Sequence, residues 1–457
     1  MIYSNRYTGV VCYGKKRKNL YLIFTSIICL ILIILSTLYK LDLRKKEISN
    51  NDYDFLKDKT IVRVWLPKDR VSNTREYQAQ KFNEKHEDIY IMLSLYDSRD
   101  YDNMLKTALA AEKGPDIMMY GFFELIKDNY IKNLDNIDNM KSDDFVYFNG
   151  NPIGVRSNEE NVKLIWNKDI FKKAGLDPNK SPRNWDELVE YSRKIKKQFP
   201  DIVPFQFPII EYEDFKQSIG EPSVNLDNVY TSFWDYKNGE YKFNSSRNIL
   251  NIYNKLYKEN LLDNEFDKKS KKDLRTNFYQ GNVAMHLSTF EDKGYFSNII
   301  PLNFDIGINS LPKFKESHED KQYYLSNSNF LCINNYILKK TEKEQKAVKE
   351  VFQWLTSENT NREILNTRMA ISPTIKKAQV KNDIYKEYNE VSNFKTEVLD
   401  PSIFISRDSA KTVKLSVDAI KGNKSIDEVI KQLNYSYGEY CDLTQKYRKI
   451  QLNTFKK

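Results

Sequence analysis

The side chains that most often carry catalysis or hold a metal ion are sparse in this 457-residue chain. Its three histidines, His86, His286 and His318, lie far apart, and its four cysteines form no C-x-x-C pair. No H-E-x-x-H, G-x-S-x-G, G-x-x-x-x-G-K-[ST] or G-x-G-x-x-G motif occurs. A carboxylate pair for glycoside hydrolysis remains as an alternative among the 63 acidic residues, but no spacing singles one out. We therefore predict a protein that is not an enzyme, with no metal and no cofactor.

The chain is better supplied for binding a polar solute, because aromatic residues make up 13% of it. A sugar site stacks the apolar face of the ring on aromatic side chains. It also gives each buried hydroxyl a carboxylate, an amide or an arginine as a partner. A lone histidine in an alternating apolar segment, such as His286, is interpreted as a packed or half-exposed residue and not as a ligand.

Strands and helices alternate at the start of the soluble part, which predicts a parallel α/β sheet. The expected strands are 60–66, 90–95 and 115–120, and the expected helices are 73–86 and 100–113, the second closed by Gly114. In such a sheet the ligand binds beyond the carboxyl ends of the strands. Those ends are residues 65–70, 95–96 and 120–122.

Residues 150–175 organise the rest of the chain. Two short strands, 153–155 and 162–166, flank a polar loop at 156–161. In the second strand Val162, Leu164 and Trp166 share one face. The helices that follow have clear start and stop signals: Asn167 caps 170–174, Gly175 ends it, and Asn184 opens 185–197.

This crossover resembles that of extracellular solute-binding proteins of family 1, the maltose-binding-like proteins that serve ABC importers. The matching motifs are WNKDIFKKAG at 166–175, WDEL at 185–188, MLKTALAA at 104–111 and FYQGNVAMHLSTF at 278–290. The resemblance extends over nearly everything after residue 60. It implies an α/β fold of the periplasmic-binding-protein type II, with two interleaved lobes. We place the first lobe at about 60–153 and 290–335, and the second at about 162–285 and 340–457.

The resemblance also implies a ligand site in a cleft between the lobes. The residues expected there are Trp65, Asp69, Arg70, Tyr120, Arg156, Glu159, Glu160, Trp234, Phe290, Asp292, Asn327 and Arg407. Arginines at 70, 156 and 407 make an anionic sugar an alternative ligand, because guanidinium groups bind carboxylate and phosphate in a bidentate way. The glutamates at 159 and 160 could instead neutralise those arginines.

Several conspicuous residues are interpreted as structural. Trp166 lies on a crossover strand and Trp185 at a helix start, so both are expected in the core. For Trp65 the core and the ligand site are equally favoured. The charge run 268–275 is expected to be a solvated helix face. Cys332 has apolar neighbours, which favours a buried thiol, and its pairing with Cys441 stays open.

The net charge of +9 gathers near the N-terminus, since residues 1–50 carry a net +7. A nucleic-acid partner is therefore not predicted. Residues 20–39 contain no charge and are long enough for a transmembrane signal anchor, with 1–19 in the cytoplasm and 40–59 as a tether. Because Ile28 precedes Cys29, where a lipoprotein signal needs a small residue, lipoprotein anchoring is not expected.

The resemblance implies an extracellular, membrane-anchored binding component of an ABC importer. It would bind a small solute, most simply a carbohydrate, and deliver it to permease subunits in the membrane. The alternative is a sensor or interaction protein of the same fold that is partnered with a signalling kinase.

Overall fold

The computed structural model describes residues 27–28, 30–32, 34–38, 56–68, 72–120, 125, 129–135, 145–148, 151–156, 162–223, 233–235, 240–289, 292, 302–315, 324–325, 330–368, 394–395 and 405–438. For Tyr120, Arg156, Trp234 and Arg407 it describes the backbone and not the side chain. The chain divides into two compact units, Met1–Lys59 and Thr60–Lys457. The described residues between 27 and 38 are helical and exposed.

Within the described part of the chain, no helix has both the length and the apolar character needed to cross a membrane. The transmembrane helix expected over 20–39 is therefore not confirmed.

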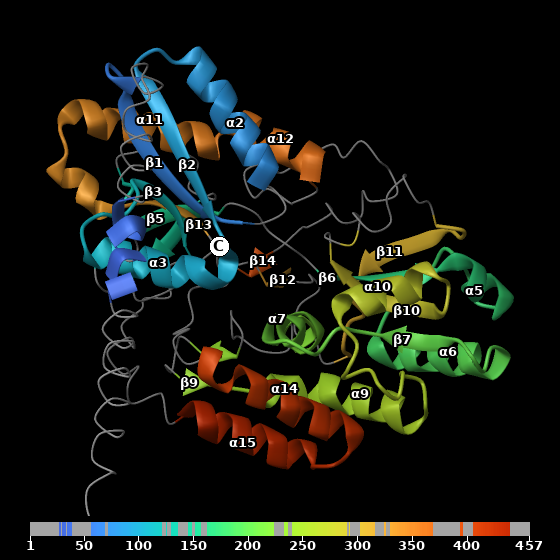
Figure 1. Cartoon of the computed structure of the whole chain (residues 1–457). Coiled ribbons are helices and arrows are strands. Elements are labelled where there is room, and N and C mark those ends of the chain that lie inside the picture. Colours follow the sequence, from blue (N-terminus) through green and yellow to red (C-terminus); the bar gives the residue numbers. More distant parts are fainter. Residues whose placement is uncertain are drawn as a thin grey trace, which may run out of the picture. The chain divides into compact units, whose positions relative to one another are not determined.

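The first sheet of the larger unit has six strands in the order β2-β1-β3-β13-β5-β4 (Figure 1). Its strands are β1 (Thr60–Pro67), β2 (Ile89–Tyr96), β3 (Ile117–Tyr120), β4 (Phe145–Phe148), β5 (Asn151–Arg156) and β13 (Phe330–Ile333). β1 runs parallel to β2 and β3, as predicted, whereas β13 is antiparallel to both β3 and β5. β1, β2, β3 and β5 therefore all end at one edge of the sheet.

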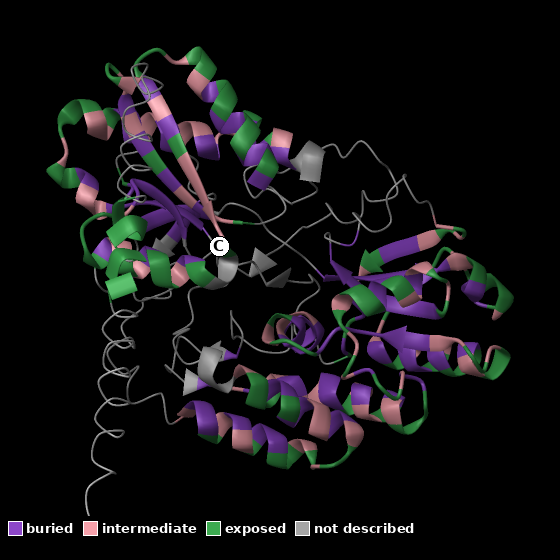
Figure 2. Ribbon diagram, in the orientation of Figure 1, coloured by how far each residue is buried: buried purple, intermediate pink, exposed green. Residues whose placement is uncertain are grey.

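Helices cover both faces of this sheet. They are α2 (Ser72–Lys85), α3 (Ser98–Ala110), η6 (Asn335–Lys339), α11 (Glu342–Thr356) and α12 (Glu358–Arg368). α2 and α11 share one apolar cluster with β1, whereas Tyr101 and Leu105 of α3 pack on the other face. Figure 2 shows the resulting buried strands between amphipathic helices. Cys332 lies in this core as a free thiol, and burial raises its pKa. Cys441 lies outside the described residues.

The second sheet has four strands in the order β11-β6-β10-β7. They are β6 (Val162–Asn167), β7 (Val203–Gln206), β10 (Val283–Thr289) and β11 (Ile306–Ser310). β6 is antiparallel to β10 and β11, and β7 is parallel to β10. Consequently β7, β10 and β11 all end at the edge where β6 begins.

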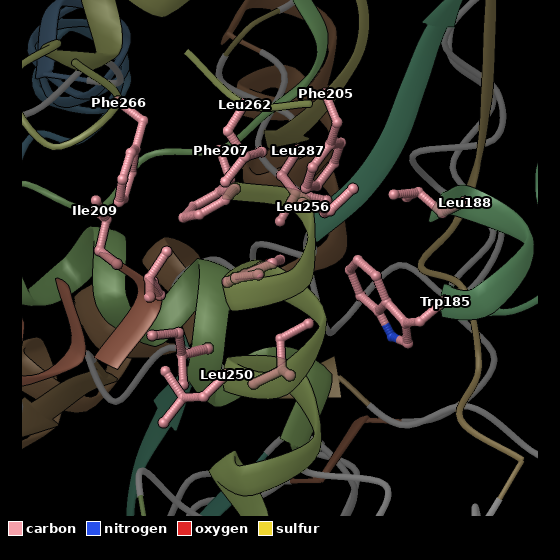
Figure 3. Packing of buried hydrophobic residues seen from close by; sticks show 14 of the residues in the cluster. Trp185, Leu188, Phe205, Phe207, Ile209, Leu250, Leu256, Leu262, Phe266 and Leu287 are labelled. Carbon is pink, nitrogen blue, oxygen red and sulfur yellow. The ribbon is translucent and has the colours of Figure 1, made fainter. Parts of the chain in front are cut away.

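Most of the helices of this part contribute to one large core with the sheet (Figure 3). They are α5 (Lys168–Lys173), α6 (Trp185–Gln198), α7 (Tyr212–Phe215), η3 (Lys216–Gly220), α8 (Glu221–Ser223), η4 (Asn244–Ser246), α9 (Arg247–Lys258), α10 (Lys271–Tyr279), α14 (Ile405–Lys421) and α15 (Ile426–Gly438). α14 packs against α9 and α15. Phe278 of α10 contributes to a separate apolar cluster with Ile165 of β6. Two short ribbons complete the structure: β8 (Trp234–Asp235) with β9 (Glu240–Tyr241), and β12 (Tyr324–Leu325) with β14 (Phe394–Lys395).

Local signals set most helix ends as expected. The Asn167 side chain accepts hydrogen bonds from the backbone N–H groups of Asp169 and Ile170, and the Asn184 side chain accepts one from Glu187. Gly175 follows α5 with φ of 71°, a conformation that favours glycine. The prediction that Gly114 closes α3 is wrong, because the helix ends at Ala110 and Glu112 takes the left-handed conformation with φ of 57°.

Two lobe assignments need correction. β11 was expected in the first lobe, but it pairs with β6 in the second sheet. Gly307 makes this pairing close, because a Cβ at that position would lie 2.0 Å from the Trp166 ring. α11 was expected in the second lobe, but its apolar residues, including Val351 and Phe352, pack on the first sheet. The chain therefore passes between the sheets at 156–162, 310–330 and 368–405.

Candidate functional site

The carboxyl edge of the six-stranded sheet gathers three of the predicted site residues. β1, β2 and β3 are parallel, and they end at Pro67, Tyr96 and Tyr120. Phe330, the first residue of β13, pairs with Tyr120 on one side and with Arg156 on the other. The strand register thus brings positions 65, 120 and 156 to the same edge, which is where an α/β sheet binds its ligand.

Trp65 is a predicted site residue near this edge whose side chain the structure describes. It is half-buried, and its ring centroid lies 4.8 Å from that of Tyr96 in a tilted arrangement. The buried Tyr101 hydroxyl donates hydrogen bonds to the carbonyl oxygens of Trp65 (2.9 Å) and Met119 (2.8 Å), and its burial raises its pKa well above the usual value. These bonds tie α3 to β1 and β3 and hold the Trp65 backbone. A fixed, partly exposed indole ring can stack on the apolar face of a sugar.

Most of the other predicted site residues are described less fully. Asp69, Arg70, Glu159, Glu160, Phe290 and Asn327 lie outside the described residues. The backbone of Trp234 belongs to β8, in the β8–β9 ribbon. Arg407 was expected to precede the C-terminal helices, but it lies within the first turn of α14. Which of these side chains meet a ligand stays a prediction.

The matching edge of the second sheet carries buried polar side chains. Lys163 of β6 is 1% exposed and pairs in register with Ser288 of β10 and Ser310 of β11. The Gln206 side chain, at the end of β7, donates a hydrogen bond to the Leu274 carbonyl oxygen over 2.7 Å. A buried lysine and a buried amide are costly to desolvate, so each needs a polar partner inside the protein.

Asp292 contacts one of these polar groups, Ser288, and is 3% exposed. One carboxylate oxygen pairs with Nε of Arg275; the other accepts hydrogen bonds from the Ser288 hydroxyl (2.7 Å) and the Thr289 backbone N–H (3.2 Å). Both oxygens are therefore engaged inside the protein. These internal bonds give Asp292 a structural role, and its prediction as a ligand contact stays a prediction.

His286 is the buried neighbour of this ion pair. It is 2% exposed, and its Nε2 lies 3.8 Å from a carboxylate oxygen of Asp292. Burial lowers its pKa to about 4, although Asp292 acts in the opposite direction. At neutral pH the imidazole is therefore uncharged. The interpretation of His286 as a packed residue is confirmed. Across the described segments, no group of three or more His, Cys, Asp or Glu side chains could hold a metal ion.

Two residues of this edge were missed by sequence reasoning. The run 268–275 was expected to be a solvated face, which holds for Lys268 but fails for Arg275, which is 8% exposed. A signal was available, because Arg275 lies beside Leu274 and three residues before Phe278, on the apolar stripe of α10. Lys163 was missed because a lysine in an otherwise apolar strand offers no local sign of burial.

The two predictions of structural tryptophans are confirmed. Trp166 is 3% exposed, and its Nε1 donates a hydrogen bond to the Pro178 carbonyl oxygen over 2.9 Å. Trp185 is 1% exposed and packs edge-on against Phe205 and Tyr253. Neither indole is available to a ligand.

Known proteins with similar sequences and structures include transport proteins. Residues 67–361 match a family model described as bacterial extracellular solute-binding protein. The sn-glycerol-3-phosphate-binding periplasmic protein UgpB of Salmonella paratyphi A is 27% identical over 265 residues, 51% of this chain and 56% of the relative. The chain thus spans about half the length of this curated relative.

Solved structures share the fold. The sugar-binding protein MalE from Xanthomonas citri superposes with a TM-score of 0.69 at 16% identity, covering 86% of this chain and all of that one. The cyclic alpha-maltosyl-1,6-maltose binding protein from Arthrobacter globiformis superposes with a TM-score of 0.67 at 14% identity, covering 84% of this chain and all of that one. At these identities the likeness establishes the two-lobed α/β fold of periplasmic binding proteins.

Proposed function

The chain belongs to the family of bacterial extracellular solute-binding proteins, and from this premise we propose that it is the substrate-binding component of an ABC importer. It binds a small solute, most simply a carbohydrate, in a cleft between its two lobes and delivers the solute to a membrane permease. Closure of the two lobes around the ligand is the hinge motion typical of this fold. The chain is not an enzyme in this proposal.

The observation that carries the proposal is the carboxyl edge of the six-stranded sheet. Four strands end there, and the half-buried Trp65 is held by its contacts with Tyr96 and Tyr101. The remaining ligand contacts in this proposal come from loops and strand ends that lead to the same region. They are Asp69, Arg70, Tyr120, Arg156, Glu159, Glu160, Trp234, Phe290, Asn327 and Arg407.

A phosphorylated polyol or sugar is the second candidate ligand. The relative with 27% identity is named for binding sn-glycerol 3-phosphate, whereas the structural neighbours are named for binding sugars. Arginines at 70, 156 and 407 are the residues that would recognise a phosphate, because guanidinium groups bind it in a bidentate way. A neutral oligosaccharide would depend instead on the aromatic side chains.

The ligand class is tested by thermal unfolding of the full chain in a detergent without a sugar headgroup. The panel contains oligosaccharides, uronates, sugar phosphates, glycerol 3-phosphate, polyamines and amino acids. A ligand at one hundred times its dissociation constant stabilises the fold by about 2.7 kcal/mol, which is a clear shift. We expect Trp65→Ala and Glu160→Ala to abolish that shift. Trp354→Ala is the matched control, because Trp354 packs against Phe82 away from the edge.

If Trp354→Ala also abolished the ligand-induced shift in thermal unfolding, the loss would be attributed to lower stability and not to the removal of a binding residue. No shift with any compound, from folded protein, would contradict the transport proposal. It would favour a sensor or interaction protein of the same fold partnered with a signalling kinase.

The attachment to the membrane is a separate part of the proposal. Residues 20–39 are without charge, and four consecutive basic residues at 15–18 precede them. We expect the full chain to stay with the membrane fraction after extraction at alkaline pH, whereas a chain that begins at residue 51 is released. Release of the full chain under the same conditions would exclude a membrane-spanning anchor.

A further inference from the structure

Helix α10 ties together three segments at the carboxyl edge of the second sheet. The Leu274 carbonyl oxygen accepts the hydrogen bond from Gln206, the last residue of β7. One turn before Arg275, Nζ of Lys271 lies 3.2 Å from the buried carboxylate of Asp214 in α7. Arg275 itself reaches Asp292, three residues after β10. A single helix thus contacts the end of β7, α7 and Asp292.

The Arg275–Asp292 ion pair is more deeply buried than the Lys271–Asp214 pair. The side chains of Arg275 and Asp292 are 10% and 4% exposed. Ser288 and Thr289, the last two residues of β10, supply the other donors to the Asp292 carboxylate. Asp292 is therefore fixed to the end of the strand and to α10 at the same time.

Stability alone does not explain such a pair. Removing two charges from water costs several kcal/mol per ion, and a well-packed apolar pair of similar volume is often as stable or more stable. A buried polar network has a different property, since it selects one arrangement of the groups that it connects. The groups connected here are α10, Asp292 and the carboxyl end of the central strand β10, at the edge where α/β sheets bind ligands.

We propose that the buried Arg275–Asp292 pair is a positioning device that holds Asp292 and the carboxyl end of β10 against α10 at the edge of the second sheet. Arg275 and Asp292 act as positioning residues in this proposal. The consequence for ligand affinity rests on the proposed solute-binding function, whereas the anchoring of the end of β10 does not.

The first experiment needs no ligand. Arg275→Met combined with Asp292→Leu replaces the ion pair with an apolar pair in the full chain. We expect backbone amide exchange over 283–292, apart from the Thr289 amide that loses its acceptor, to accelerate about tenfold or more while the protein stays folded. The matched control is Lys421→Met with Asp267→Leu, a partly buried pair of the same lobe with a 2.7 Å contact between Asp267 and Lys421 of α14. It should leave exchange over 283–292 unchanged.

Asp292→Asn keeps the size of the side chain and provides a second variant if the double variant does not fold. Unchanged exchange over 283–292 in a folded variant would overturn the proposal.

The second experiment measures affinity by calorimetric titration with maltotriose and with glycerol 3-phosphate. For a probe that binds the parent chain, we expect a dissociation constant about tenfold higher in the Arg275→Met/Asp292→Leu variant and no change in the control. Equal affinity in the variant and the parent would overturn the role in binding. If neither probe binds the parent, the proposed ligand classes fail, and the exchange measurement still decides whether the pair holds the end of β10.

Discussion

Replacing Trp185 with alanine is expected to lower the free energy of unfolding by about 3–5 kcal/mol. The side chain is 1% exposed, begins α6 and packs against Phe205, Tyr253 and Phe314. These rings lie in the large core between the four-stranded sheet and its helices (Figure 3). Alanine would leave a cavity that such a rigid aromatic cluster fills only in part, so both the lost burial and the cavity contribute to the cost.

Urea unfolding followed by far-UV circular dichroism measures this change. Trp185→Phe is the informative companion, because the Trp185 Nε1 group finds no hydrogen-bond acceptor in the described part of the protein. Phenylalanine removes this unsatisfied donor while it keeps most of the ring, so it should cost much less than alanine. Trp354→Ala, at a half-buried position, should also cost less. Equal losses in the phenylalanine and alanine variants would contradict the cavity explanation.

The second large effect is a loss of stability in acid that comes from His286. The folded protein holds this imidazole with a pKa of about 4, below the ordinary value of 6.5, because burial disfavours its charged form. Asp292 opposes that shift, whereas Arg275 and Lys271 reinforce it. As pH falls below 6.5 the unfolded chain takes up a proton that the folded chain does not accept until about pH 4. Stability therefore decreases over this window and is unaffected by His286 above it.

The difference of about 2.5 pKa units corresponds to about 3 kcal/mol between pH 6.5 and pH 4. Urea unfolding at several pH values should show a shallower acid dependence for His286→Gln than for the parent chain. His86→Gln serves as the control, because His86 is half-buried at the end of α2, where it stacks on Phe82. An acid dependence that is unchanged in His286→Gln would show that the folded protein protonates His286 at the same pH as the unfolded chain.

The two effects originate in the same lobe but on different sides of its sheet. Trp185 belongs to the large core with α6, whereas His286 contacts the Phe278 ring of α10. The two sites share no partner. We therefore expect the effects of Trp185→Ala and His286→Gln on the free energy of unfolding to be nearly additive when the two substitutions are combined.

Sequence by itself determined the elements whose signals are local. The strands β1, β2 and β6 follow from β-branched and alternating residues, and their observed bounds lie within a residue or two of those predicted. Asn167 and Asn184 cap their helices because a side-chain oxygen needs only the N–H groups two or three residues ahead. The family was also accessible from the sequence, because its motifs are short and contiguous.

The candidate site was accessible in part. The rule that parallel strands end at one edge was sufficient to place Trp65 and Tyr120 together, and the register adds Arg156 through Phe330. Asp292 was predicted as a site residue, but only the fold revealed that Arg275 of α10 forms an ion pair with its carboxylate. Seventeen positions separate these two residues, and no local pattern specifies such a pairing.

Tertiary structure alone decided which sheet is joined by the elements in the later part of the chain, such as β11 and α11. β11 has the alternation of any half-buried strand, and its place beside β6 depends on Gly307 meeting the Trp166 ring. α11 has the apolar stripe of any amphipathic helix, and it covers β1 because the strand offers an apolar face of matching shape. Periodicity defines which face of an element is buried, whereas its partner is chosen by packing and hydrogen bonding between segments that are distant in the chain.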